Sequence, residues 1–313
     1  MKHALSTLAI ALSLAAPAAF ANDIQYYKTV QNTDFTEAGY GGMRGVGSGA
    51  ITLAGVSGTV TQALLYWHGP TNSLNPLVNA AVTFGGTSIL GTNIGFSSDN
   101  NWGFLNSQAY RADVTALVTG NGAYSLANFN NGSAEINGAS LLVFFNDGNA
   151  ANNRDIVLFN GNDSNAPNTY DANGWNVSLP GINYTAGTAA VRMTVSDGQS
   201  FQDDALKING TTVAGPGAVF DGTTVPANAG TTVGNGSLWD IRSFDATAFL
   251  SPGNNTLTVS TGVSQDYLSL INVAIDLPVG AAPPVVAIPE PETYALMLAG
   301  LAALGWTSRR RHR

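Results

Sequence analysis

Few residues in this chain have the chemistry of a catalytic site. Its body contains a single histidine, His68 in the stretch LLYWHGP, since His3 and His312 lie in the terminal segments, and there is no cysteine anywhere. No Gly-x-Ser-x-Gly motif is present to supply a serine nucleophile. The lack of cysteine also excludes thiolate nucleophiles and Cys-based zinc sites. We therefore expect His68 to be a structural or surface residue near a strand end.

Oxygen-bearing side chains gather in several turns. The segments NDGNAANNRD, NGNDSN and SDGQSFQDD combine carboxylate and amide oxygens, which are the ligands that Ca²⁺ prefers. Their spacing fits no EF-hand, and the same residues are ordinary turn formers, so both interpretations stay open. Calcium is the one cofactor that the sequence suggests, and no other metal or cofactor is indicated. The candidate ligands are Asp147, Asn149, Asp155, Asp163, Asp203 and Asp204.

Two tryptophans in Asn- and Gly-rich segments are candidates for exposed rings that stack on sugars. They are Trp102 in SSDNNWGFLN and Trp175 in DANGWNV. A glycoside hydrolase would need paired carboxylates, drawn from the many aspartates and from Glu37 and Glu135. The sequence does not disclose which carboxylates meet in space. A carbohydrate-binding module and a polysaccharide-acting enzyme thus remain as alternatives to a protein without catalytic activity.

The elements that position these residues read as strands. Short apolar or alternating runs are bounded by Gly, Asn, Asp or Pro, which is typical of a β-sandwich or jelly roll. No helical periodicity of about 12 residues or more appears outside the two termini. We predict an all-β fold. The runs are 63–69, 80–86, 139–147, 154–162, 189–198, 255–262 and 268–278.

An internal repeat divides the body. The segment starting DVTALVTGNG at Asp113 aligns with DATAFLSPGN at Asp245, and each is preceded by a Gly-containing hairpin and followed by two strands. We therefore expect two tandem β-sandwich or jelly-roll-like units, residues 22–150 and 151–280. In each unit the aspartate is expected to form a buried cap on a single helical turn. This pattern loosely resembles an uncharacterised β-sandwich domain of prokaryotic surface proteins, which has no established activity.

The body is acidic and sparsely charged. Charged residues make up 10% of the chain, and without the two terminal segments seven basic residues stand against eighteen acidic ones, a net charge near −11. Nucleic-acid binding requires clustered basic residues, so this class of function is excluded. The surface must be solvated mainly by amides and hydroxyls, as in many extracellular β domains.

The first 21 residues have the layout of a secretory signal peptide. Lys2 precedes an apolar run that ends near Pro17, and Ala19 and Ala21 provide the A-x-A spacing. We expect cleavage after Ala21 by signal peptidase, following transport by the export machinery.

The C-terminal segment is a candidate membrane tether. After a linker at 281–288, Pro289, Glu290 and Pro291 keep the chain extended. A short apolar helix is expected at 293–308; thirteen apolar residues span only about 20 Å, so it would cross a bilayer only with local thinning. A basic cluster that resists translocation closes the chain as a cytoplasmic anchor: Arg309, Arg310, Arg311 and Arg313.

Together, the PEP tripeptide, the short apolar run and the arginine-rich end resemble the PEP-CTERM sorting signal of Gram-negative bacteria, over residues 289–313. The resemblance implies processing by exosortase, a membrane-embedded enzyme, and implies nothing about the activity of the body. We expect a protein exported through the inner membrane, transiently anchored there, and released to the cell surface or extracellular matrix. Its expected role is structural and non-catalytic, associated with exopolysaccharide or biofilm; the alternative is a calcium-assisted carbohydrate-binding module with extracellular polysaccharide as partner.

Overall fold

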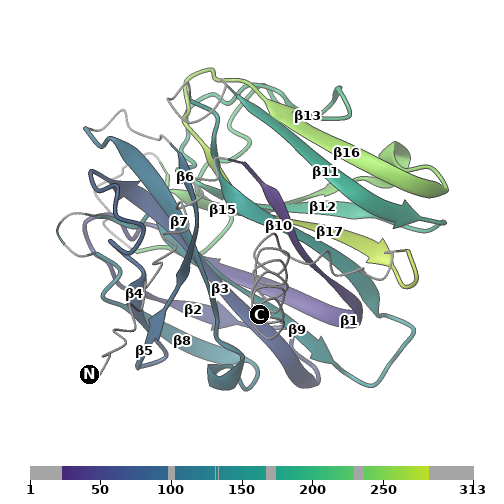
Figure 1. The fold of residues 1–313 in the computed structure, drawn as a ribbon, viewed down its shortest axis with the longest axis horizontal. Helices are drawn as coiled ribbons and strands as arrows, with labels where there is room; N and C mark the ends of the chain where they lie inside the picture. The colour runs from purple at the N-terminus through teal and green to yellow at the C-terminus, as the bar shows by residue number, and fades with distance from the viewer. Residues whose placement is uncertain are drawn as a thin grey trace, which may run out of the picture. The chain divides into compact units, whose positions relative to one another are not determined.

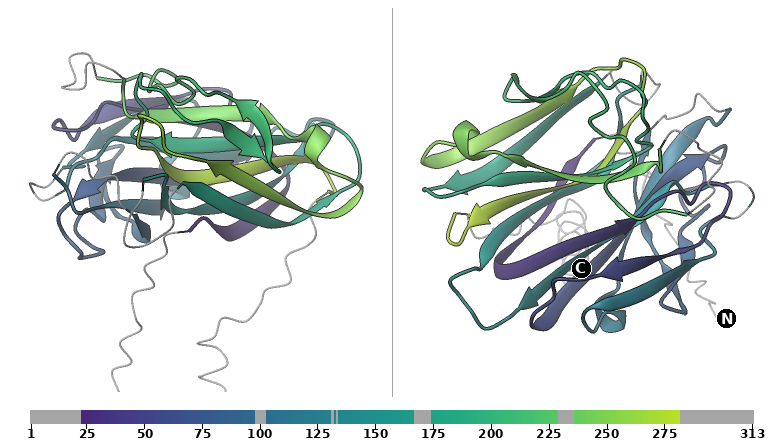
Figure 2. Two further views of the ribbon diagram at one scale, coloured as in Figure 1. Left: turned by 90° about the horizontal axis from the view of Figure 1, so that it is seen from above. Right: turned by 180° about the vertical axis from the view of Figure 1, so that it is seen from behind.

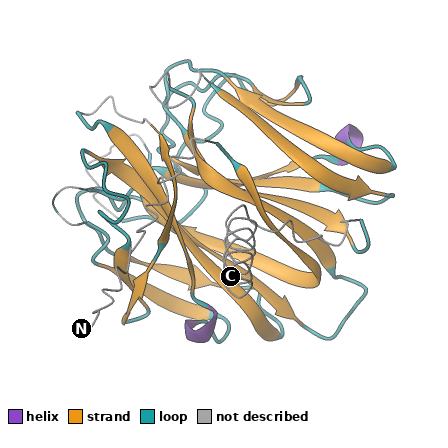
Figure 3. Cartoon of the chain, viewed as in Figure 1, coloured by secondary structure: helices purple, strands orange, loops and turns teal. Residues whose placement is uncertain are grey.

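The all-β prediction is confirmed by the computed structural model (Figure 3). It describes residues 23–97, 103–130, 132, 134–166, 174–228 and 236–281. Two compact units are distinguished, Met1–Ala282 and Pro283–Arg313. The predicted signal peptide, most of the predicted linker, the sorting segment with the helix predicted at 293–308, and Trp102 lie outside the described residues. Among the residues that are described, no helix combines the length and the apolarity needed to cross a membrane.

Seventeen strands and two single-turn 3-10 helices make up the described regular structure (Figure 1). In the first half they are β1 (Gln25–Tyr40), β2 (Gly49–Leu53), β3 (Thr59–Thr71), β4 (Ala81–Phe84), β5 (Thr87–Leu90), β6 (Thr92–Ser97), β7 (Asn106–Asp113), η1 (Thr115–Leu117), β8 (Gly122–Ala127) and β9 (Gly138–Asn146). In the second half they are β10 (Arg154–Ser164), β11 (Trp175–Tyr184), β12 (Ala190–Ser196), β13 (Leu206–Ile208), β14 (Thr211–Ala214), β15 (Trp239–Asp245), η2 (Thr247–Phe249), β16 (Gly253–Thr261) and β17 (Ser269–Pro278).

The strands form one large sheet and two small ones. The large sheet has nine strands in the order β15-β12-β17-β10-β1-β9-β3-β7-β6, and the small sheets have the orders β2-β8-β4-β5 and β11-β16-β13-β14. Within the part of the chain that the structure describes, neighbouring strands of these sheets pair antiparallel. Figure 2 displays the layered arrangement from above and from behind.

The two halves of the chain have matching strand orders. In the large sheet, β9-β3-β7 of the first half corresponds to β17-β12-β15 of the second, and the small sheets correspond strand for strand. Each half has its 3-10 turn between corresponding strands, η1 between β7 and β8 and η2 between β15 and β16. This order agrees with the repeat in the sequence. The large sheet is nevertheless continuous across position 150/151, where the boundary between two units was predicted.

Strand β1 provides that continuity. Its first part, from Gln25 to Thr33, pairs with β10, and its second part, from Asp34 to Tyr40, pairs with β9. The change of partner coincides with a register shift around Asn32, whose φ of 52° lies in the left-handed region. One strand of the first half therefore belongs to the sheets of both halves.

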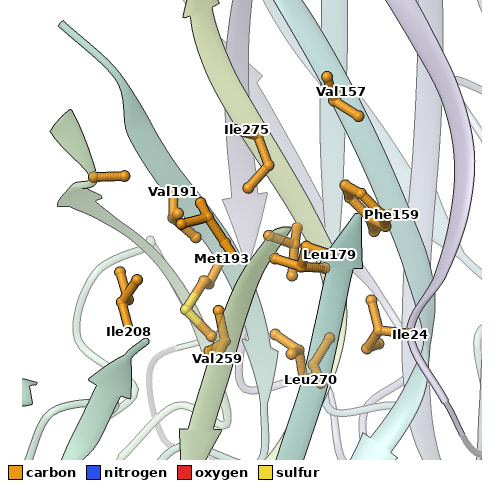
Figure 4. Close-up of a cluster of buried hydrophobic side chains, with 14 of the residues drawn as sticks. Ile24, Val157, Phe159, Leu179, Val191, Met193, Ile208, Val259, Leu270 and Ile275 are labelled. Carbon is orange, nitrogen blue, oxygen red and sulfur yellow. The ribbon is translucent and has the colours of Figure 1, made fainter. Parts of the chain in front are cut away.

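Three hydrophobic clusters form the core. One lies between the large sheet and β2-β8-β4-β5, and includes Trp67, Phe84 and Val143. A second lies between the large sheet and β11-β16-β13-β14, and Figure 4 shows its side chains, among them Phe159 and Met193. The third joins the two halves through residues of β3, β9, β10 and β17.

The third cluster explains the unbroken apolar runs of β9 and β10. In β9, Leu141 and Val143 face the core of the first half, whereas Leu142 and Phe144 face the third cluster. Side chains alternate between the faces of a strand, so a strand covered on both faces needs apolar residues at every position. GASLLVFF is therefore a strand buried on both sides, and its burial fixes the two halves against each other.

Candidate functional site: a buried polar seam

The best candidate for a functional site is a group of buried polar side chains between the two halves of the chain, which we call the seam. The Nδ1 atom of His68, near the end of β3, is 2.7 Å from Oγ of Ser196, at the end of β12. The same Oγ accepts a hydrogen bond of 2.9 Å from Nδ2 of Asn137. His68, Ser196 and Asn137 are each 0% exposed. A serine and a histidine at this distance have the contact of a nucleophile and its base.

Burial perturbs the histidine of this contact. Burial in the first place, and Arg44 in the second, lower the pKa of His68 to about 3, so that the ring is neutral at every physiological pH. Neither His68 nor Ser196 is exposed to solvent in this structure. The geometry agrees with the expectation that His68 is structural: it joins two strands of different halves.

An ion pair continues the seam. Arg44 donates through Nε to Oδ1 of Asn137 and through Nη2 to Oδ1 of Asp197, both at 2.9 Å. The two charged side chains are 11% and 2% exposed. Burial raises the pKa of Asp197, and the Arg44 charge opposes that rise. Arg44 thereby links the glycine-rich loop of the first half to the second half.

Further contacts cross between the halves beside this ion pair. Thr194 in β12 donates to Oε1 of Glu37 in β1 at 2.7 Å. Burial raises the pKa of Glu37, although Arg192 and the hydrogen bonds of the site act in the opposite direction. The amides of Gly41 and Gly42 donate to carbonyl oxygens of Pro226 and Ser237. The stretch GYGGMRGVGSG is thus a loop held against the second half, and it leads into a strand rather than into a helix.

Four aspartates next to the seam are buried: Asp197, Asp203, Asp240 and Asp266. Asp203 accepts from the backbone amides of Val219 and Phe220 through one oxygen, and Asp240 accepts from Gly222. Burial, together with neighbouring carboxylates, raises the pKa of Asp203 to about 6 and that of Asp266 to about 8. These carboxylates hold the loops that follow β12 and β14.

The structure does not bring the six predicted calcium ligands together. Asp147 and Asn149 lie in one exposed turn, where Asp147 accepts from the amide of Asn149. Asp155 accepts from the amides of Asn32 and Gly280. Within the ranges that the structure describes, no group of three or more His, Cys, Asp or Glu residues is arranged to hold a metal ion.

The other three predicted ligands lie in the second half. Asp163 is 4% exposed in β10, Asp203 is held as described above, and Asp204 is exposed and accepts from the amide of Ala205. Asp203 and Asp204 are adjacent in sequence but not alike in setting, because one side chain is buried and the other is exposed. Sequence proximity was a poor guide here, since neighbouring residues of an extended segment point in opposite directions.

The prediction that Trp175 has an exposed ring is wrong. It is 1% exposed, and its ring contacts Phe220 edge to face with centroids 5.8 Å apart. The ring therefore belongs to the core and is not available to stack on a sugar. Strand β11 begins at Trp175 itself, so the ring belongs to a strand of the small sheet.

The two repeated aspartates have equivalent settings. Asp113 accepts from the amide of Thr115 at 3.0 Å, and Asp245 accepts from that of Thr247 at 2.8 Å. Both carboxylates are exposed, so the prediction of a buried cap is wrong in that respect. The threonine of each turn is half-buried and extends the link: Thr115 Oγ1 accepts from the amide of Ala63, and Thr247 Oγ1 accepts from that of Ala189.

Sequence reasoning missed the residues that bind the halves together, above all Arg44, Asn137 and Ser196. One signal could have found Arg44: it is one of only seven basic residues in the body and stands alone in a glycine-rich loop. A lone cation in such a loop needs a nearby anion. Its partner Asp197 was visible in the sequence only as part of a turn.

The comparison with protein families decides the meaning of the C-terminal segment. The model of the PEP-CTERM protein-sorting motif matches residues 287–311. This chain carries a PEP-CTERM sorting motif. The match supports an exosortase-substrate protein, as the resemblance implied, and places the motif two residues earlier than predicted.

Other comparisons add little about the body of this PEP-CTERM protein. No curated protein matches the chain. A solved structure of recombinant N-glycanase F (PNGase F) is 12% identical over 84% of this chain and 96% of its own, with a TM-score of 0.24. A structure of peptide-N(4)-(N-acetyl-β-D-glucosaminyl) asparagine amidase is 13% identical over 83% and 97%, with a TM-score of 0.22. TM-scores of this size carry no argument about fold or activity.

Proposed function

We propose that this chain is an exported, exosortase-sorted structural protein of the cell surface or extracellular matrix, without catalytic activity. The observation that carries the proposal is the PEP-CTERM motif at residues 287–311. The expected signal peptide at residues 1–21 supports it, because a sorting motif of this kind needs a chain that has left the cytoplasm. Exosortase, signal peptidase and the export machinery are the partners that follow.

The body supports a structural role by the way it uses its ionisable groups. His68, Arg44 and Asp197 join the two halves, and Asp203 and Asp240 hold loop amides. Each of these groups is buried or nearly so, and each binds another part of the fold. Catalysis requires such groups to face a substrate. A rigid body of low charge suits a matrix rich in exopolysaccharide.

A calcium-assisted carbohydrate-binding module has less support. Of its two candidate stacking residues, Trp175 lies in the core and Trp102 falls outside the described residues. The carbohydrate-binding alternative predicts quenching of tryptophan fluorescence by a sugar, abolished by a chelator. A glycan array probed with the released protein tests both this alternative and the identity of any polysaccharide partner.

The sorting step is tested by Glu290→Gln and Pro289→Ala in the full chain, with Pro283→Ala as a matched control outside the motif. In cells with exosortase, the unaltered chain and the control are expected to lose the C-terminal segment, whereas the motif variants keep it and stay with the inner membrane. Cell fractionation and the intact mass of the product measure this. An unchanged mass and location of the Glu290 and Pro289 variants would refute the role of the motif.

A further inference from the structure

The body of the chain contains seven basic residues once the two terminal segments are set aside. Four of them form ion pairs with carboxylates of the fold: Arg44, Arg154, Arg192 and Arg242. The other three form no ion pair with any residue that the structure describes: Lys28, Arg111 and Lys207. Carboxylates are plentiful in a body with a net charge near −11, yet two of these three cations lie side by side.

The two neighbouring cations are Lys28 and Arg111, and they lie at one aromatic ring. The guanidinium carbon of Arg111 is 3.4 Å from the centroid of the Tyr27 ring, and Nζ of Lys28 is 5.8 Å from the same centroid. Burial lowers the pKa of Lys28, the carboxylate of Asp113 opposes this shift, and the positive charge of Arg111 adds to it. The two cations therefore repel each other, and an anion bound beside both would relieve that repulsion.

A β-bulge at the start of β1 produces this arrangement. The register of β1 against β10 shifts between Tyr26 and Lys28, so Tyr27 is the extra residue of the strand. Bulges redirect side chains, and this one brings those of Tyr27 and Lys28 together with Arg111 of β7. All three side chains are half-buried, so each keeps some contact with solvent. We call Tyr27, Lys28 and Arg111 the basic cluster.

Unused hydrogen-bonding atoms lie next to the basic cluster. Arg111 donates through Nη1 to Oδ1 of Asn160 at 3.2 Å, and it is directly opposite Tyr66 in the pairing of β3 with β7. Residues opposed in this way point to the same face of the sheet. Within the described part of the chain, neither Nδ2 of Asn160 nor the hydroxyl of Tyr66 has a hydrogen-bond partner, although both residues are buried. The fold thus provides polar groups here that it does not itself satisfy.

The same strand carries a second contact between an arginine and an aromatic ring, which serves as an internal comparison. The guanidinium carbon of Arg192 is 5.3 Å from the ring centroid of Phe35, later in β1. Arg192 also forms an ion pair of 3.9 Å with the buried carboxylate of Glu37. Among the described residues, the fold supplies a carboxylate to Arg192 and none to Arg111. Arg111 is therefore the arginine that is available to an external carboxylate.

Asp113, the carboxylate that acts on Lys28, is already engaged by other groups. Its Oδ1 accepts from the amide and the hydroxyl of Thr115 at 3.0 and 2.6 Å, and its Oδ2 accepts from Nε2 of Gln62 at 3.1 Å. Nζ of Lys28 donates to Oε1 of the same glutamine at 2.5 Å. The side chain of Gln62 therefore links the ammonium group to the carboxylate, and direct contact does not neutralise the charge of Lys28.

We propose that the basic cluster binds a carboxylate group of an acidic polysaccharide. This rests on the proposed function, which places the protein in a matrix rich in exopolysaccharide, and it specifies the class of sugar. A guanidinium can bind a carboxylate through two parallel N–H groups, and a nearby ammonium group adds a second charge. A folded acidic protein would bring a broad surface against a body near −11 and be repelled, whereas a polysaccharide strand is thin and presents its carboxylates singly. Neither calcium nor an exposed tryptophan takes part.

Two matched comparisons test the site in the full chain. Oligogalacturonate is the probe, and its methyl ester is the control, because the ester keeps the sugar rings and removes the negative charges. Arg111→Gln and Lys28→Gln are the site variants, and Lys207→Gln is their control, because Lys207 is an exposed cation on β13. Calorimetric titration at low salt gives the dissociation constants of chains purified in detergent. These chains carry the site whether or not their tails have been processed, so a failure of sorting is distinguished from a failure of binding.

We expect oligogalacturonate to bind the unaltered chain and Lys207→Gln equally, and Arg111→Gln about tenfold more weakly, because hydrogen bonds to a charged group are lost. Lys28→Gln should weaken binding by a smaller factor, because an ammonium group forms no bidentate contact. The methyl ester should not bind. The proposal is overturned if the unaltered chain does not bind the acid, if Arg111→Gln binds as tightly as Lys207→Gln, or if the ester binds as tightly as the acid. Tighter binding of oligoglutamate would overturn the assignment to a saccharide.

A chemical footprint of the unaltered chain makes the result independent of how any variant folds. Lys28 and Lys207 are the two lysines of the body. Oligogalacturonate should reduce the acetylation of Lys28 by an N-hydroxysuccinimide ester and leave that of Lys207 unchanged, as measured by mass spectrometry of peptides. The methyl ester should protect neither lysine. Equal labelling of Lys28 with and without oligogalacturonate would contradict binding at the basic cluster.

Discussion

Removing the charge of Arg44 should loosen the connection between the two halves. In Arg44→Met, the buried carboxylate of Asp197 loses its ion pair, and Asn137 loses the hydrogen bond from Nε. Breaking a buried pair by deleting one partner typically costs about 3–5 kcal/mol. We expect a loss at the lower end of this range, ~3 kcal/mol, because Arg44 retains 11% exposure and Asp197 can take up a proton.

The protonation of Asp197 gives this prediction a pH dependence. Burial already raises the pKa of Asp197 while Arg44 opposes the rise. Without Arg44 the pKa rises further, so the folded variant binds a proton that the unfolded chain releases. The stability contributed by that proton is present at low pH and is lost as the pH rises through the pKa of the folded variant. The destabilisation by Arg44→Met is therefore larger at pH 8 than at pH 5.

Urea unfolding of the mature protein, followed by circular dichroism, measures the effect. The matched variant Arg44→Met/Asp197→Leu removes both charges, and it should recover part of the lost stability because no unpaired carboxylate remains. Arg154→Met is a control at a partly exposed ion pair with Asp276, expected to cost no more than ~1 kcal/mol. The argument would be refuted if the stability losses of Arg44→Met and Asp197→Leu, measured singly, simply added in the double variant. It would also be refuted if Arg44→Met lost less stability than the control Arg154→Met.

Three further predictions concern other groups. Burial raises the folded pKa of Asp203 to about 6 and that of Asp266 to about 8, from an ordinary value of 3.8, so their stabilising contribution is fully present below about pH 3.8 and is lost as the pH rises to 8; the unfolding free energy should fall over this range, and less steeply in Asp266→Asn. Asp155→Ala leaves the amides of Asn32 and Gly280 without their acceptor and should cost about 3 kcal/mol in urea unfolding; a loss under ~1 kcal/mol would contradict this role. Asp113→Ala and Asp245→Ala should each lower the free energy of unfolding slightly, and the two losses should add in the double variant, since the two turns are separate; strong non-additivity would show that the turns are coupled.

The sequence was informative where a pattern is local. Alternating and apolar runs bounded by turn residues predicted the strands, and the repeated D-x-T-A segments predicted two equivalent turns, because both depend on neighbouring residues. Burial was harder to predict. Trp175 is surrounded in sequence by turn-forming residues yet lies in the core. The carboxylates of Asp113 and Asp245, which were predicted to be buried, are exposed.

The seam could not be predicted because it depends on long-range contacts. His68 and Ser196 are 128 residues apart, and Arg44 and Asp197 are 153 apart. Nothing in the spacing of these residues indicates that they meet. The shared role of β1 was hidden for the same reason, since the repeat assigns this strand to the first half alone.

The change of partner of β1 near Asn32 has a consequence for the order in which the strands of the protein assemble. The first strand to leave a ribosome or a translocation channel finds its neighbours only after residues 138–164 have followed it. Until then β1 has neither of its neighbouring strands, β9 and β10, and it stays exposed to chaperones and proteases. Pairings so distant along a polypeptide are slow to form, so the chain is expected to remain pliable during passage and to acquire its rigidity only afterwards.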